Sequence, residues 1–286
     1  MPHPVKGVDH VFLLVNDLDK SAEQYRRLGF TLSPRGLHSK EKGTGNYTIM
    51  FPDDYFELLG IVAETDGNQH QREKLADQGE GLHAIACRID SALEAKSELA
   101  AFDIQTSEVG VFSRPVQLPD GNEGVAAFET VSFVDGEVPQ GMMFMCQHKT
   151  RETVWLPELI EHENGATGLS AISVVSAEPE MTARGFARLY AEGKVTAEAA
   201  TWRVLTGSNS ADILVYDRDQ AEKIYGKAAV SQTPDAAFSG LRISVYELNK
   251  TRAVLDAKGV DYNLQRQSIV VIPANAHGVI LEFFEG

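Results

Sequence analysis

The feature that most constrains the fold of this chain is a pattern that recurs four times along it. Each copy opens with a glycine followed by a short apolar run that has a polar residue near its start. The glycines are Gly7, Gly81, Gly168 and Gly240, and the polar residues are His10, His83, Ser170 and Arg242. The spacing between successive copies is nearly equal, which predicts a fold assembled from repeated units.

Each opening run is followed by a segment with helical periodicity and then by further strand-like runs. In the first copy, Leu18, Ala22 and Tyr25 are spaced as on one face of a helix. The runs NYTIMF and YFELLGI follow, divided by proline and aspartates. Because the other copies repeat this order, the unit is predicted to be a strand, a helix, and two or three strands.

The connections between units predict two halves. The longest connection is rich in charge, contains proline, and lies between the second and third copies. We therefore expect a first half at residues 1–150, a linker at 151–165 and a second half at 166–286. The predicted units are 1–75 and 80–150 in the first half, and 166–230 and 235–286 in the second.

Charge and composition exclude several classes of function. The formal net charge is −15, so nucleic acid and anionic membranes are disfavoured partners. The chain has no apolar run long enough to span a bilayer and no signal-peptide pattern at its start, so we expect a cytoplasmic protein. Cys87 and Cys146 lie in apolar runs and are expected to be buried, reduced thiols.

Two histidines and one glutamate are candidate metal ligands. By strand alternation, His10 shares a face with Phe12, and His83 shares one with Ile85. Glu57 lies between bulky apolar residues, where an isolated carboxylate is costly unless it is paired, protonated or bound to a metal. Two imidazoles and a carboxylate suit a divalent metal ion. The alternative is that both histidines are hydrogen-bonded core residues.

With His in opening strands and Glu in a closing strand, the four units resemble the vicinal oxygen chelate superfamily. The nearer resemblance is to its glyoxalase-like domain proteins, on HSKEKGTGNYTIMFPDDYFE (38–57) and MFMCQHKTRETVW (143–155). This resemblance implies an α+β fold of tandem βαβββ modules, with curved mixed sheets around a cleft. It also implies that metal ligands come from the first and last strands of paired units.

Transferred residue by residue, the resemblance makes His10, Glu57 and His83 three of the metal ligands and gives Glu57 a catalytic role. The fourth position falls where the expected inward register offers Met145 or Gln147, so Gln147 is the candidate fourth ligand. The second carboxylate that serves glyoxalase I type enzymes as a base is then missing. A His, His, Glu triad is similar to that of Fe(II) ring-cleaving dioxygenases, although those enzymes place the carboxylate in the other unit.

The second half departs further from this pattern. Its equivalent positions are Ser170, Asp212, Arg242 and Glu282. Because the guanidinium of Arg242 repels a cation, we expect a degenerate half without a metal, in which Arg242 pairs with Glu282.

A loop in the first half supplies candidate substrate contacts. Arg35, His38 and Asn46 lie between the predicted helix and the closing strands, where they are expected to line the cleft mouth. The glycines nearby are not followed by a helix or a Walker lysine, so they are expected to form a turn and not a phosphate site.

These observations predict a divalent-metal-dependent enzyme of isomerase, lyase or ring-cleaving dioxygenase type. Its partner is expected to be a small oxygenated organic substrate, and the chain is expected to form a homodimer. Fe(II), Zn(II), Mn(II) and Ni(II) all suit the proposed ligands. The alternative is a metal-free, non-enzymatic binder similar to the antibiotic-sequestering members of the superfamily, in which the histidines only hydrogen-bond a ligand.

Overall fold

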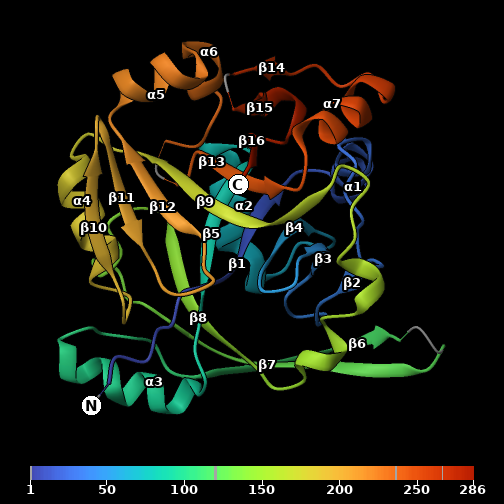
Figure 1. Ribbon diagram of the computed structural model, residues 1–286. Helices are drawn as coiled ribbons and strands as arrows, with labels where there is room; N and C mark the ends of the chain where they lie inside the picture. Colours follow the sequence, from blue (N-terminus) through green and yellow to red (C-terminus); the bar gives the residue numbers. More distant parts are fainter. Residues whose placement is uncertain (1, 119–120, 236, 266) are drawn as a thin grey trace.

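Two mixed sheets form the framework of the protein in the computed structural model (Figure 1), which describes residues 2–118, 121–235, 237–265 and 267–286. Within these residues each sheet has eight strands. The first has the order β2-β3-β4-β1-β5-β8-β7-β6, with β1 (Val8–Val15), β2 (Gly36–Leu37), β3 (Thr44–Met50), β4 (Tyr55–Ile61), β5 (Gly81–Arg88), β6 (Gly110–Gln117), β7 (Glu123–Ser132) and β8 (Met142–His148).

The second sheet repeats this arrangement with the order β10-β11-β12-β9-β13-β16-β15-β14. Its strands are β9 (Ala166–Val175), β10 (Lys194–Glu198), β11 (Thr201–Leu205), β12 (Asp212–Tyr216), β13 (Gly240–Val245), β14 (Asn263–Leu264), β15 (Ser268–Val271) and β16 (Ile280–Glu285). Each half of the chain therefore forms one sheet.

The predicted helices are present, one after the opening strand of each unit. They are α1 (Leu18–Arg27), α3 (Ala92–Leu99), α4 (Pro179–Ala187) and α7 (Leu248–Ala257). Side-chain caps fix where two of them begin: Asp17 accepts a hydrogen bond from the Lys20 amide, and Ser91 accepts one from the Glu94 amide. Three further helices connect units and were not expected: α2 (Gln69–Gln78), α5 (Arg218–Tyr225) and α6 (Lys227–Val230).

Two units join within each sheet through their opening strands. In the first half β1 pairs antiparallel with β5, while β4 runs parallel to β1 and β8 runs parallel to β5. The second half repeats these pairings with β9, β13, β12 and β16. The α+β fold of tandem βαβββ units is thus confirmed, and the first and last strands of paired units lie together at the centre of each sheet.

One hydrophobic core spans both halves. It contains the fully buried Tyr25 and Phe56 of the first half together with Phe186 and Phe283 of the second. The predicted linker is part of this packing, because His162 is buried and bonds the Met50 carbonyl oxygen through Nε2 at 2.9 Å. The division into two domains stays a prediction.

Among the described residues, no helix has the length and apolar character needed to cross a membrane. Cys87 and Cys146 are buried free thiols, as expected.

Candidate functional site

A cavity of about 240 Å³ lies against the first sheet, and residues of β1, β3, β4, β6, β7 and β8 line it. Much of its wall is apolar, including the rings of Phe12, Phe112, Phe128 and Phe144. The charged, histidine and amide side chains that face it are His10, His38, Lys42, Asn46, Glu57, Gln71 and Arg114. An apolar cavity with a few converging polar groups is typical of small-molecule sites.

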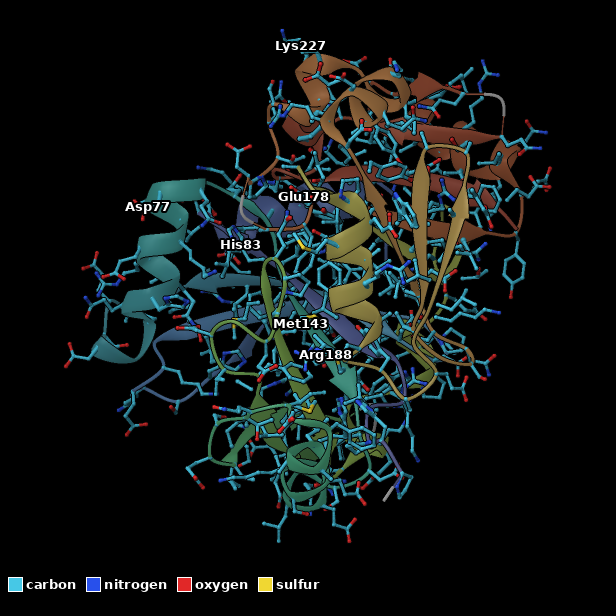
Figure 2. The ribbon with its side chains drawn as sticks, turned by 90° about the vertical axis from the view of Figure 1, so that its left-hand side faces the viewer. Asp77, His83, Met143, Glu178, Arg188 and Lys227 are labelled. Carbon is cyan, nitrogen blue, oxygen red and sulfur yellow. The ribbon has the colours of Figure 1, made fainter. Side chains whose placement is uncertain are left out.

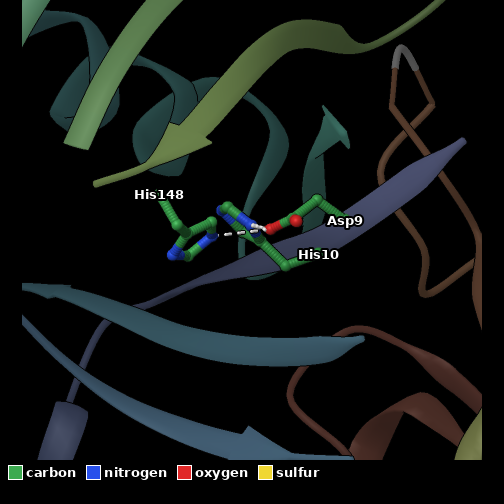
Figure 3. Close-up of side chains that lie close together, drawn as sticks. All are labelled: Asp9, His10 and His148. Atoms are coloured by element: carbon green, nitrogen blue, oxygen red, sulfur yellow. Dashed lines mark hydrogen bonds and ion pairs between the residues drawn. The ribbon is translucent and has the colours of Figure 1, made fainter. Parts of the chain in front are cut away.

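His10 is fixed in place on the cavity wall. Its ring stacks on Tyr55, with ring centroids 4.3 Å apart and an angle of 15° between the planes. Its Nδ1 lies 2.7 Å from Oδ1 of Asp9 (Figure 3). A carboxylate has no proton to donate, so Nδ1 carries the hydrogen. In the neutral ring this leaves Nε2 unprotonated.

Asp9 is a buried carboxylate that joins two histidines. It is 1% exposed, and its Oδ1 also accepts a hydrogen bond from Nε2 of His148 at 2.9 Å (Figure 3). Burial alone would raise the pKa of Asp9, but the hydrogen bonds and charges of His10 and His148 outweigh burial and hold that pKa well below its ordinary value. Asp9 is therefore ionised and can orient both rings.

The three residues are arranged in series. His10 lines the cavity, whereas Asp9 and His148 are not part of its lining. His148 is hydrogen-bonded to Asp9, and Asp9 is hydrogen-bonded to His10. An imidazole oriented in this way by a buried carboxylate has the geometry of a general base.

Glu57 on β4, Asn46 on β3 and His38, which follows β2, line the same cavity. Asn46 donates from Nδ2 to Oε2 of Glu57 at 2.6 Å. Burial lowers the pKa of His38 to about 4, so this ring is neutral near pH 7, and its Nδ1 lies 2.7 Å from the Thr44 hydroxyl.

The structure does not bring His83 to this site. His83, labelled in Figure 2, is 1% exposed. Its Nε2 contacts the carbonyl oxygen of Gly79 at the end of α2. The residues two and four positions further on, Ile85 and Cys87, belong to the main core, whereas Ala84 and Ala86 pack on the cavity side. The cause is register: His10 is three residues after its glycine, but His83 is two residues after its own.

The expected inward register of β8 is also corrected. Met143 and Met145 lie in the main core, while Phe144 and Cys146 line the cavity. Gln147 instead accepts a hydrogen bond from the Ala92 amide at the start of α3, at 3.0 Å. Gln147 is therefore outside the cavity, and β8 brings His148 to Asp9.

Arg35 is also outside the main cavity. It forms an ion pair with Asp19 at 2.9 Å and lines a neighbouring cavity instead. The assignment of His10 and Glu57 as metal ligands stays a prediction, since the structure shows only that both face one cavity.

In the second half, the expected ion pair is present. Nε of Arg242 lies 3.0 Å from Oε2 of Glu282, which also accepts a hydrogen bond from the Tyr225 hydroxyl. Asp212 pairs with Arg203. The charged side chains at these positions thus neutralise one another.

The sequence pattern did not predict a role for Asp9 or His148. Asp9 could have been found as a second ionisable residue beside His10 in an apolar strand, where it needs a partner. His148 carries no such signal, because its role depends on β8 lying next to β5 and thus near β1.

The cluster of Asp9, His10 and His148 contains side chains of the kinds that bind metal ions. Among the described residues, Asp9, His10 and His148 form a group of potential metal ligands whose donor atoms all lie within 4.8 Å of one another. The donor types suit a divalent ion. However, Oδ1 of Asp9 already contacts the rings of His10 and His148, and Oδ2 lies 4.0 Å from Nε of Arg88. Neither Asp9 nor His148 lines the cavity. The cluster therefore does not fit a catalytic ion that faces the cavity.

Comparison with known proteins identifies the family. Residues 8–190 match the model of the glyoxalase-like domain, so the chain belongs to this family of the vicinal oxygen chelate superfamily. No curated protein matches the sequence.

Solved structures share the fold at low identity. A hypothetical protein from Staphylococcus aureus is 13% identical with a TM-score of 0.64, covering 98% of this chain and 99% of that one. A xylose isomerase-like TIM barrel/4-hydroxyphenylpyruvate dioxygenase fusion protein is 11% identical with a TM-score of 0.63, covering 100% of this chain and 50% of that one. A triple mutant of 4-hydroxymandelate synthase from Streptomyces coelicolor is 11% identical with a TM-score of 0.60, covering 99% and 93%.

Proposed function

We propose that the chain is an enzyme of isomerase or lyase type that moves a proton on a small oxygenated substrate bound in the first-half cavity. One observation carries this proposal: the His10 ring lines the cavity while Asp9, itself held by His148, binds its Nδ1. A base needs both a defined tautomer and a fixed orientation, and this arrangement supplies them.

The proposed step is removal of a proton from a carbon next to a carbonyl group. The C–H bond breaks, its electron pair passes into the carbonyl as an enolate, and the proton moves to Nε2 of His10. The imidazolium that forms is stabilised by the negative charge of Asp9. Return of the proton to a different atom completes an isomerisation, and loss of a leaving group completes an elimination.

A second candidate is the divalent-metal enzyme, of isomerase, lyase or dioxygenase type. It is favoured by His10 and Glu57, an imidazole and a carboxylate that face one cavity and are donor types suited to a divalent ion. This candidate requires near-stoichiometric Fe, Zn, Mn or Ni in the purified protein, and loss of that metal in the Asp9→Asn variant. Elemental analysis of both proteins decides between the candidates.

Solvent deuterium exchange tests the proton-transfer proposal. 2-Oxo-4-phenylbutanoate and 2-oxobutanoate both carry hydrogens next to a carbonyl group, and NMR in D₂O follows their loss. We expect the protein to accelerate exchange in at least one of them, and His10→Asn to slow that exchange about 100-fold or more. Asp9→Asn should also slow it, because the amide can bind the wrong tautomer of His10.

His70→Asn is the matched control, because His70 is an exposed residue of α2. It should exchange as fast as the unchanged protein. Equal rates for His10→Asn and the unchanged protein would contradict the proposed role. Absence of any catalysed exchange would favour the non-enzymatic binder.

A further inference from the structure

Two cations face the first-half cavity without an ion-pair partner. Lys42 and Arg114 both line it, and among the described residues neither forms an ion pair with a carboxylate. In the second half, by contrast, Arg203 and Arg242 pair with Asp212 and Glu282. Partly buried charges are costly unless a counter-charge balances them. A protein with a net charge of −15 thus keeps two unpaired cations at one cavity.

The cavity carries a positive balance of charge along its lining. Glu57 is the carboxylate among the described lining residues, and its Oε2 is engaged by Asn46. His38 is neutral near pH 7, because burial lowers its pKa to about 4. Lys42 and Arg114 therefore exceed the lining carboxylate by one charge, which a single anionic group on a ligand would balance.

Flat apolar surface lies beside these cations. Nζ of Lys42 is 3.6 Å from the centroid of the Phe112 ring, and Phe112 stacks on Phe128 with centroids 4.9 Å apart and 19° between the planes. Phe12 and Phe144 line the same cavity. Lys42 and Phe128 already cover Phe112, so a ligand with a ring can bury that ring against Phe12, Phe128 and Phe144 while its charged end meets the cations.

Arg114 lies where two cavities meet. A second cavity of about 310 Å³ shares Thr48, Arg114 and Val154 with the first. The guanidinium is only partly buried and can present two parallel N–H groups to a carboxylate. An anionic group at this position would leave the remainder of the ligand inside the first cavity, toward His10.

We propose that the first-half cavity selects a small organic monoanion with a ring-bearing apolar body, whose anionic oxygens bind Lys42 and Arg114. This inference rests on the proposed function, because it names the substrate class of the same cavity. It adds that selection is made by charge, at residues other than His10.

Phenylacetate and its neutral counterpart phenylacetamide test this selection, since they differ mainly in charge. By isothermal titration at low ionic strength, phenylacetate should bind at least about tenfold more tightly than phenylacetamide. Arg114→Met and Lys42→Met keep an apolar stem and remove the charge. Each should weaken phenylacetate binding about tenfold and leave phenylacetamide binding unchanged.

Arg184→Met is the matched control, because Arg184 is an exposed residue of α4 paired with Glu180. It should leave the binding of both probes unaltered. Three results would overturn the proposed ligand class. The two probes could bind equally, both could lose the same affinity in Arg114→Met, or neither could bind at millimolar concentration.

His10→Asn separates this inference from the proposed function. Retained discrimination between the probes in this variant supports the ligand class even if His10 transfers no proton. The inference would be overturned if His10→Asn lost the difference in affinity between the two probes while the Lys42 and Arg114 variants kept it. That outcome would not affect the deuterium-exchange test of His10.

Discussion

Asp54 is a buried carboxyl group at the contact between the two halves. It is 5% exposed, and its Oδ1 accepts a hydrogen bond from the Leu169 amide at 3.0 Å. Burial raises the pKa of Asp54 to about 7, and this effect exceeds the opposing ones of the Leu169 hydrogen bond and Arg88. The folded protein therefore holds this proton at pH values where the unfolded chain has lost it.

We predict that Asp54 makes the protein less stable as pH rises. Between about pH 4 and pH 7 the folded state binds more protons at this group than the unfolded state, so the group lowers the free energy of unfolding by up to ~1.4 kcal/mol per pH unit. Asp54→Asn keeps an acceptor for the Leu169 amide and removes the titration. Urea unfolding should show the variant gaining stability relative to the unchanged protein from about pH 4 to about pH 7.

The comparison of the two proteins cancels the contributions of other titrating groups, including that of Asp9. A stability difference that stays constant over this pH range would show that Asp54 does not hold its proton in the folded state.

At the scale of single elements, the sequence predicted what depends on local patterns. The four opening strands and the helices that follow them are confirmed, because apolar periodicity and capping residues such as Asp17 and Ser91 act over a few residues. The three connecting helices α2, α5 and α6 were not predicted. In α2, for example, no residue is buried, so no apolar stripe marks it.

The site was predicted only in part, because it depends on strand register. A difference of one residue between strands moves a side chain to the opposite face of the sheet. That difference placed His83 in the core and made Cys146, rather than Gln147, a cavity residue. Register shifts between β1 and β5 near His10 and near Phe12 add to the displacement, and no local pattern reveals them.

The turn before β16 gives a prediction at this scale. Gly278 has a φ of 79°, and a Cβ at this position would lie 1.9 Å from the carbonyl oxygen of Glu80 in the other half. Gly278→Ala should therefore lower the free energy of unfolding through backbone strain and displacement of the Glu80 segment, by roughly 2–4 kcal/mol. Urea unfolding measures this change.

Gly259 provides the matched comparison. Its φ is 62°, but a Cβ there would meet nothing within 4 Å. Gly259→Ala should cost only the strain of the positive φ, about 1 kcal/mol. Similar losses for the two variants would show that the contact of Gly278 with the other half does not constrain folding.

At the scale of the whole molecule, the two halves share one topology and one core but differ in their charged residues. In the second half, the charged side chains at the positions equivalent to the candidate ligands of the first half take part in the ion pairs Arg203–Asp212 and Arg242–Glu282. The first half instead has Asp9 and His148 behind His10, and at the cavity it has Lys42 and Arg114, which form no ion pair with the carboxylates of the described residues. One copy of the fold thus pairs the charges of these positions, and the other presents a histidine to a cavity.

The tautomer of His10 tests this account most directly. Two-bond ¹⁵N–¹H correlation spectra of histidine-labelled protein distinguish protonated from unprotonated ring nitrogens, and the spectrum of His10→Asn assigns the His10 signals. We predict that neutral His10 carries its proton on Nδ1, that Nε2 is unprotonated, and that Asp9→Asn weakens this preference. A proton on Nε2 with Nδ1 unprotonated, or ring-nitrogen signals that move when a chelator is added, would contradict an Asp9-oriented base that acts without a metal.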